Sequence, residues 1–173
     1  MIYKLFVPKQ ASGANLVYFD LFNAAGSGAD LEVLSVLPVV SGAVDVTGLV
    51  SVDLLLTRTT AVGTGGTAAT REGTVLTAAT FTGVSAGNAL GPFVTARLTP
   101  SGGATGGAVL SFRSAFTEET NSASYLVQDM VRNYMPDLPG IRVNVGGGIR
   151  VVQGAVASVG NIAFDVTFRL LMK

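Results

Sequence analysis

Hydrophobic and polar residues alternate with a period of two along much of the chain, and the C-terminal segment shows this most clearly. Ile162, Phe164, Val166, Phe168 and Leu170 share one parity, whereas the residues between them are mostly polar. A period of two places successive side chains on opposite faces of a β-strand, whereas a helix would scatter these residues around its axis. The pattern therefore predicts a strand with one buried and one polar face.

Similar short segments recur along the chain, separated by Gly-rich turns. The candidate strands are 2–7, 16–22, 31–40, 50–56, 74–81, 93–99, 108–114, 141–145, 149–152 and 162–170. Short strands at this spacing predict an all-β fold, an antiparallel β-sandwich of jelly-roll-like type with about nine or ten strands. The length suits a single domain over 1–173, with about the first 15 residues as a candidate N-terminal arm.

One segment breaks the β pattern and predicts a helix near 122–135. Its apolar residues recur at the spacing of one helical face. They are Leu126, Val127, Met130, Val131 and Tyr134. Asn121 or Ser122 could cap the start, and Pro136 would end the helix, which gives an expected length of about 10–14 residues.

Composition limits the chemistry and points towards assembly. The chain has no Cys, His or Trp, so it lacks thiolate nucleophiles, imidazole bases and the zinc sites that need these ligands. Only 13% of its residues are charged and its net charge is zero, whereas soluble domains carry roughly 25% charged residues. No stretch of about 20 apolar residues suggests a membrane span. We therefore expect the protein to bury uncharged surface against copies of itself or another protein, with no direct contact to nucleic acid or membrane.

The sequence offers no candidate catalytic or cofactor site. Gly63, Gly65 and Ala68 match a degenerate dinucleotide motif, but the residues that follow show no helical period, so the strand–turn–helix context of the motif is missing. Glu118 and Glu119 are adjacent and would point to opposite faces of an extended segment, so they do not form a catalytic pair. We predict no enzyme activity, catalytic residue, cofactor or metal.

The polar strand faces carry charges of both signs, which predicts cross-strand ion pairs. The residues concerned are Asp20, Asp53, Asp165, Arg58, Arg97, Arg113 and Arg169.

A low-complexity Gly/Thr loop is the first candidate for a contact with a partner, because exposed loop tips are where partners often dock. The candidate partner-binding residues are Gly63, Thr64, Gly65, Gly66 and Thr67 in this loop, and the aromatic residues Tyr3 and Tyr18.

The C-terminal half carries a resemblance to a known class of protein. A helix-bearing crossover at 125–134 precedes GIRVNVGGGIRVVQG at 140–154 and the alternating NIAFDVTFRLL at 161–171. This pattern resembles bacteriophage capsid decoration or cement proteins, which are small virion β-sandwiches. The resemblance implies a virion structural protein on the capsid exterior, made in the host cytoplasm, a homotrimer bound to the major capsid protein, with no cofactor. A phage tail tube, connector or fibre subunit, or a carbohydrate- or ligand-binding β-sandwich, are the alternatives.

Overall fold

A computed structural model of the protein describes residues 2–41, 50–68, 70–71, 74–75, 94–101, 106–117, 128–134, 137, 139–156 and 161–172. Nine strands have three or more residues: β1 (Ile2–Ala11), β2 (Val17–Asn23), β3 (Ala29–Ser41), β4 (Val50–Thr59), β8 (Val94–Leu98), β9 (Gly106–Thr117), β10 (Ile141–Val143), β11 (Gly147–Gln153) and β12 (Asn161–Met172). The remaining elements are the two-residue strands β5 (Thr67–Ala68), β6 (Thr70–Arg71) and β7 (Thr74–Val75), and the helix α1 (Met130–Tyr134). The predicted strands are thus confirmed, except that only 74–75 of the segment 74–81 lies within the described residues.

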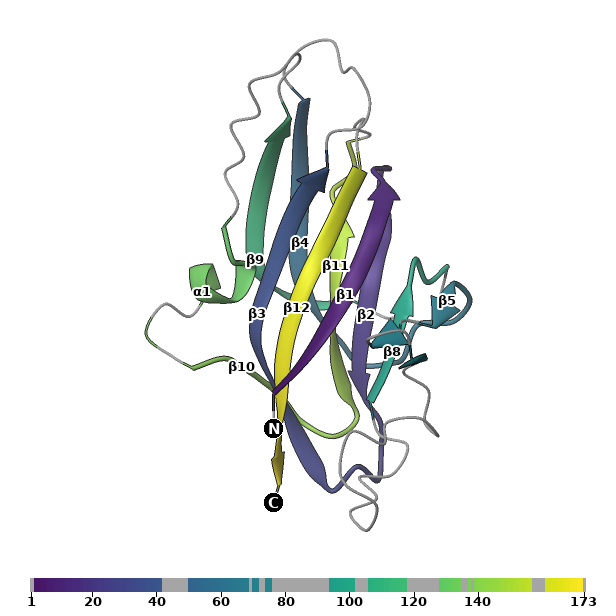
Figure 1. Ribbon diagram of the computed structural model, residues 1–173, viewed down its shortest axis with the longest axis vertical. Coiled ribbons are helices and arrows are strands. Elements are labelled where there is room, and N and C mark those ends of the chain that lie inside the picture. Colours follow the sequence, from purple (N-terminus) through teal and green to yellow (C-terminus); the bar gives the residue numbers. More distant parts are fainter. Residues whose placement is uncertain are drawn as a thin grey trace.

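The strands form two main sheets that face each other (Figure 1). A four-stranded sheet has the order β1–β12–β3–β10, and a six-stranded sheet has the order β5–β8–β2–β11–β4–β9. In Figure 1, β3, β12 and β1 lie in front of β9, β4, β11 and β2. Every strand pair is antiparallel. The predicted antiparallel all-β sandwich is therefore confirmed.

Eight strands pair in a nested series that runs from the chain ends inwards. β1 pairs with β12, β2 with β11, β3 with β10, and β4 with β9. β12 also pairs with β3, and β11 with β4, which divides the nested pairs between the two sheets. This connectivity is that of a jelly roll, an architecture found in viral capsid, lectin and cupin domains. β8 and β5 extend the six-stranded sheet beyond β2.

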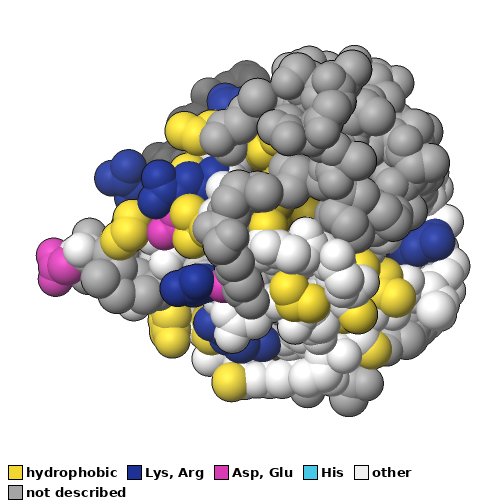
Figure 2. Space-filling model, turned by 90° about the horizontal axis from the view of Figure 1, so that it is seen from below, with side chains coloured by type: hydrophobic (Ala, Val, Ile, Leu, Met, Phe, Trp, Pro, Cys, Tyr) yellow, Lys and Arg dark blue, Asp and Glu magenta, His cyan; other side chains and the backbone are white. Residues whose placement is uncertain are grey.

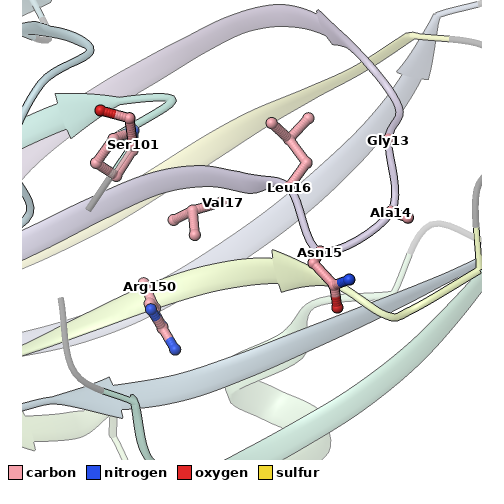
Figure 3. Close-up of a pocket in the computed structure, with 8 residues that line it drawn as sticks. Gly13, Ala14, Asn15, Leu16, Val17, Ser101 and Arg150 are labelled. Carbon is pink, nitrogen blue, oxygen red and sulfur yellow. The ribbon is translucent and has the colours of Figure 1, made fainter. Parts of the chain in front are cut away.

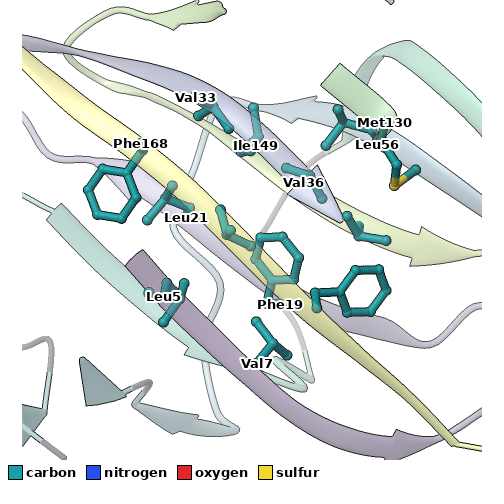
Figure 4. Close-up of a cluster of buried hydrophobic side chains, with 14 of the residues drawn as sticks. Leu5, Val7, Phe19, Leu21, Val33, Val36, Leu56, Met130, Ile149 and Phe168 are labelled. Atoms are coloured by element: carbon teal, nitrogen blue, oxygen red, sulfur yellow. The ribbon is translucent and has the colours of Figure 1, made fainter. Parts of the chain in front are cut away.

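The core lies between the sheets and consists of side chains from both inward faces (Figure 4). Four of the five predicted inward residues of β12 are buried, namely Ile162, Phe164, Val166 and Phe168, and Leu170 is partly buried against the same core. The ring centroid of Phe164 lies 5.1 Å from that of Tyr18 and 5.6 Å from that of Phe19. Tilted aromatic rings attract each other at these distances, so this cluster joins the two sheets.

A β-bulge in β2 explains why two adjacent aromatic residues both reach the core. The pairing with β11 shifts by one residue between Val151 and Val152, and Tyr18 is the extra residue on β2. Tyr18 and Phe19 are both fully buried, and both contact Phe164. Regular alternation would have turned one of the two rings outward.

The helix lies within the predicted region, but its described length is only five residues. The Oδ1 atom of Asp129 caps it by accepting hydrogen bonds from the backbone N–H groups of Val131 and Arg132, at 2.8 and 3.3 Å. A cap at Asp129 places the start of α1 later than expected. The expected caps, Asn121 and Ser122, lie outside the described residues.

The N-terminal segment is a strand of the sandwich, which corrects the expectation of an arm. β1 pairs with β12 from Ile2, opposite Arg169, to Ala11, opposite Asn161. Its inward side chains join the core, and they are Tyr3, Leu5 and Val7. Residues 12–16 form the turn that leads into β2.

Candidate functional site

The Gly/Thr loop predicted to contact a partner joins β4 to β5. Gly63 is buried, whereas Thr64, Gly65, Gly66 and Thr67 are exposed. Gly65 and Gly66 have φ angles of 69° and 62°. Glycine adopts this left-handed region without strain, so the loop turns sharply at its exposed tip.

Three hydrogen bonds hold this loop against the six-stranded sheet. The backbone N–H of Ser101 donates to the carbonyl oxygen of Thr64 at 3.0 Å, and the Nη1 of Arg97 donates to the carbonyl oxygen of Gly65 at 3.0 Å. The third runs from the backbone N–H of Gly63 to the Oδ2 of Asp20. Two of these bonds are accepted by backbone carbonyl groups of the exposed tip and the third is donated by the buried Gly63, so the loop is attached to the sheet at three consecutive residues.

Asp20 is a fully buried carboxylate on the outward face of β2. Its Oδ1 accepts a hydrogen bond from the backbone N–H of Arg97 at 3.1 Å. Arg97 on β8 and Arg150 on β11 are its cross-strand neighbours. Burial raises the pKa of Asp20 above its usual value, whereas the N–H donors of Gly63 and Arg97 and the charges of Arg97 and Arg150 act against that rise.

Tyr3 and Tyr18, the aromatic residues predicted to contact a partner, both lie in the core. Their exposed fractions are 2% and 0%. The ring of Tyr3 stacks on that of Phe168 with centroids 5.6 Å apart, and the hydroxyl of Tyr18 donates to the Oε1 of Gln153 at 2.8 Å. Burial raises the pKa of Tyr18 well above its usual value. Because a contact with a partner needs exposed atoms, we do not place either residue in the candidate surface.

A groove of about 430 Å³ lies next to the loop, between the β1–β2 turn and the residues that follow β8 (Figure 3). It is lined by Gly13, Ala14, Asn15, Leu16, Val17, Pro100, Ser101 and Arg150. The volume falls within the range of roughly 300–1,000 Å³ that is typical of ligand sites, but such sites are usually rich in aromatic side chains. None of the described residues that line this groove is aromatic, so they do not favour a sugar or another small ligand.

The outward side of the four-stranded sheet carries exposed hydrophobic side chains. Ile2 and Phe6 on β1 are 63% and 57% exposed, and Val39 on β3 is 39% exposed. Phe6 lies opposite Asp165 of β12, which in turn lies opposite Leu37 of β3. We call the exposed Ile2, Phe6 and Val39, together with the half-buried Leu37, the exposed outer face.

Two ion pairs cross the same sheet near the start of β3. Arg142 of β10 pairs with Asp30, with 2.6 Å between Nη2 and Oδ2, and Arg169 of β12 pairs with Glu32. Both carboxylates are buried. In the view of the molecule from below, Lys and Arg side chains gather on one side, with hydrophobic side chains between them (Figure 2). The prediction of cross-strand ion pairs included Arg169 but neither of these two acids.

Two features of the candidate surfaces were missed from the sequence. Phe6 shares its parity with Lys4 in β1, and this lysine was the available signal that Phe6 faces water. The sequence around Asp20 carries no signal that this residue is buried, because the loop residue that covers it, Gly63, lies 43 positions away.

Across the described parts of the chain, no group of three or more acidic residues is placed to hold a metal ion. The helical residues there form no segment long and apolar enough to cross a membrane. Comparison of the chain with protein-family models, curated proteins and solved structures found no match. Support for a function therefore comes from the fold, the loop and the exposed surfaces.

Proposed function

We propose that the chain is a virion structural protein that binds and stabilises a capsid shell as a decoration or cement protein. It acts on the capsid exterior as a homotrimer bound to the major capsid protein. The observation that carries the proposal is the exposed outer face, because it offers apolar side chains that gain free energy when another subunit covers them. Burying one Phe or Ile side chain contributes about 1.5–3 kcal/mol.

The jelly-roll connectivity supports the same role. Capsid proteins use this architecture, and here the nested pairing of β1 with β12 places both chain ends in one sheet. A fold by itself does not determine function, however, so the exposed surfaces that the fold presents carry the functional assignment.

The low charge of the chain supports assembly as well. A protein that stays monomeric needs charges to keep its surface soluble, and only 13% of these residues are charged. In the assembled state we assign the exposed outer face to a contact between subunits. We assign the loop tip, Thr64–Thr67, to a contact with the shell, since it projects from the opposite sheet.

The absolute mass in solution, measured by light scattering behind a sizing column, tests the proposal. We expect about three times the chain mass of 17.6 kDa. Phe6→Ser should shift the protein towards monomer, with a rise in dissociation constant of about tenfold or more. Val109→Ser is the matched control, because Val109 is 56% exposed on the other sheet.

Binding to shells completes the test. The purified protein should co-sediment with shells of the major capsid protein prepared without it. A monomer that does not co-sediment would refute the proposal, and hexameric rings or open tubes would favour the tail-tube alternative. An unchanged mass for Phe6→Ser would remove the exposed outer face from the subunit contact.

A further inference from the structure

Asp20 is buried on the side of its sheet that would ordinarily face water. Its neighbours along β2, Phe19 and Leu21, point into the core, so the Asp20 side chain points outward by alternation. Its exposed fraction is nevertheless 0%. A carboxylate is rarely removed from water without specific partners, because desolvation of the charge is costly.

The position of Gly63 is matched to this carboxylate. A Cβ atom at residue 63 would lie 2.5 Å from the Oδ2 of Asp20 and 2.7 Å from the Cβ of Pro100. Only glycine therefore fits between them without displacement. The N–H of Gly63 and the N–H of Arg97 use one carboxylate oxygen each.

We propose that Asp20 is a positioning residue for the loop tip, Thr64–Thr67: its ionised carboxylate holds the loop at Gly63, and protonation frees this attachment at acid pH. The hydrogen bonds that the tip itself accepts from Ser101 and Arg97 remain. The hydrogen bond between Asp20 and Gly63 lies within one chain and forms without a partner. Its consequence for a partner rests on the function proposed above, in which the tip contacts the shell.

Protonation would break the contact for a simple reason. A carboxylate offers acceptor sites on both oxygens, whereas a neutral carboxyl group keeps one good acceptor and gains an O–H donor. One of the two N–H donors, on Gly63 or Arg97, then loses its partner. The Gly63 bond is the more easily lost, because the N–H of Arg97 is part of a paired strand while Gly63 lies in a loop.

The charges around Asp20 set the direction of its titration. Among the described residues, the charged side chains that face it are Arg97 from β8 and Arg150 from β11, and both favour the carboxylate. β4 presents the neutral Thr57, which accepts a hydrogen bond from the Nε of Arg150 at 3.2 Å. Burial has the larger effect, so the pKa of Asp20 is raised, and the contact with Gly63 is lost at a less acidic pH than it would be for an exposed aspartate.

NMR of the isolated wild-type protein tests the holding contact without any substitution. The amide proton shift of Gly63 should titrate with the same midpoint as the carboxyl carbon of Asp20, above the usual pKa of 3.8. The hydrogen-exchange protection of the Gly63 amide should fall about tenfold or more across that midpoint. A Gly63 amide that does not follow the Asp20 titration would overturn the proposal.

Asp20→Asn mimics the neutral acid at constant pH, and Asp165→Asn is the matched control on the other sheet. We expect lower protection of Gly63 in Asp20→Asn at pH 7 and no change in Asp165→Asn. Unchanged protection in Asp20→Asn would refute the holding role.

Sedimentation of Asp20→Asn with shells tests shell binding by the loop tip separately from the hydrogen bond between Asp20 and Gly63. Loss of co-sedimentation together with loss of protection would support both. Loss of protection with full co-sedimentation would support the holding role of Asp20 in the wild-type protein but refute the assignment of the loop tip to the shell.

Discussion

Gln153 connects two turns to the core, and replacing it with leucine should cost the fold several hydrogen bonds at once. The side chain is 1% exposed. Its Oε1 accepts from the hydroxyl of Tyr18 and from the N–H of Gly13, both at 2.8 Å, and its Nε2 donates to the carbonyl oxygen of Val156 at 3.0 Å. Leucine has a similar size but makes none of these bonds.

The expected loss in free energy of unfolding follows from which of the groups bonded to Gln153 can find a new hydrogen-bond partner. The hydroxyl of Tyr18 is fully buried and would keep no partner, at a cost of about 1–3 kcal/mol. Gly13 and Val156 lie nearer to solvent and can regain water, so together they add about 1 kcal/mol. We expect Gln153→Leu to lower the free energy of unfolding by about 2–4 kcal/mol. Tyr18→Phe, which leaves the bond from Gly13 intact, should cost about 1 kcal/mol.

The double substitution makes this reasoning refutable. Once Tyr18→Phe has removed the hydroxyl, Gln153→Leu no longer leaves a buried group unsatisfied. The double variant should therefore cost about 1–2 kcal/mol less than the sum of the two single changes. Urea unfolding followed by far-ultraviolet circular dichroism measures all four proteins. Additive costs, or a Gln153→Leu variant within about 0.5 kcal/mol of wild type, would refute the idea of a shared buried hydrogen bond.

Three further predictions concern stability and are measured by urea unfolding. The pKa of Tyr18 is raised in the native state, so its contribution to the free energy of unfolding is full below about pH 10 and falls as the pH rises further. The free energy of unfolding of Tyr18→Phe should therefore decline less between pH 9 and 11 than that of the wild type. Equal declines would contradict this. Gly148→Ala should cost about 1–3 kcal/mol, because the new Cβ would lie 2.5 Å from the Oγ1 of Thr59, whereas at Gly147 the nearest atom is 3.4 Å away, so that Gly147→Ala should cost clearly less. Asp129→Ala should cost about 1 kcal/mol or more through loss of the helix cap and of the hydrogen bond from the N–H of Val36, while Asp129→Asn keeps an acceptor oxygen and should cost less; a similar loss in both variants would argue against a role for this oxygen.

Local alternation was enough to predict most of the strands but not always their buried faces. In β12 one parity is apolar and the other mostly polar, so both the strand and its inward face could be predicted. In β1 both parities carry large apolar residues, with Tyr3 on one and Phe6 on the other. The pattern therefore predicts a strand but does not distinguish its two faces, so the prediction of Tyr3 as a surface residue is wrong and the exposure of Phe6 is not predicted.

The candidate site depends on contacts that no local pattern encodes. The bulge that turns Tyr18 inward exists only because β2 and β11 pair with a shifted register. Likewise, Asp20 is buried by a loop that follows β4, and the order of strands in each sheet places that loop beside β2. The sequence did identify the Gly/Thr loop itself, since glycine-rich composition is a local signal.

The nested pairing of the strands also constrains the order in which the fold can form. Closing a short loop loses less chain entropy than closing a long one, and among the four nested pairs β4 and β9 are the closest in sequence, while β1 and β12 are the most distant. A topology dominated by such distant pairings folds slowly. During synthesis β1 emerges before the other strands of the nested pairs and must wait for β12 before it can pair. Assembly is therefore expected to proceed outward from β4 and β9, and the four-stranded sheet, with the exposed outer face on its surface, is completed only at the final step.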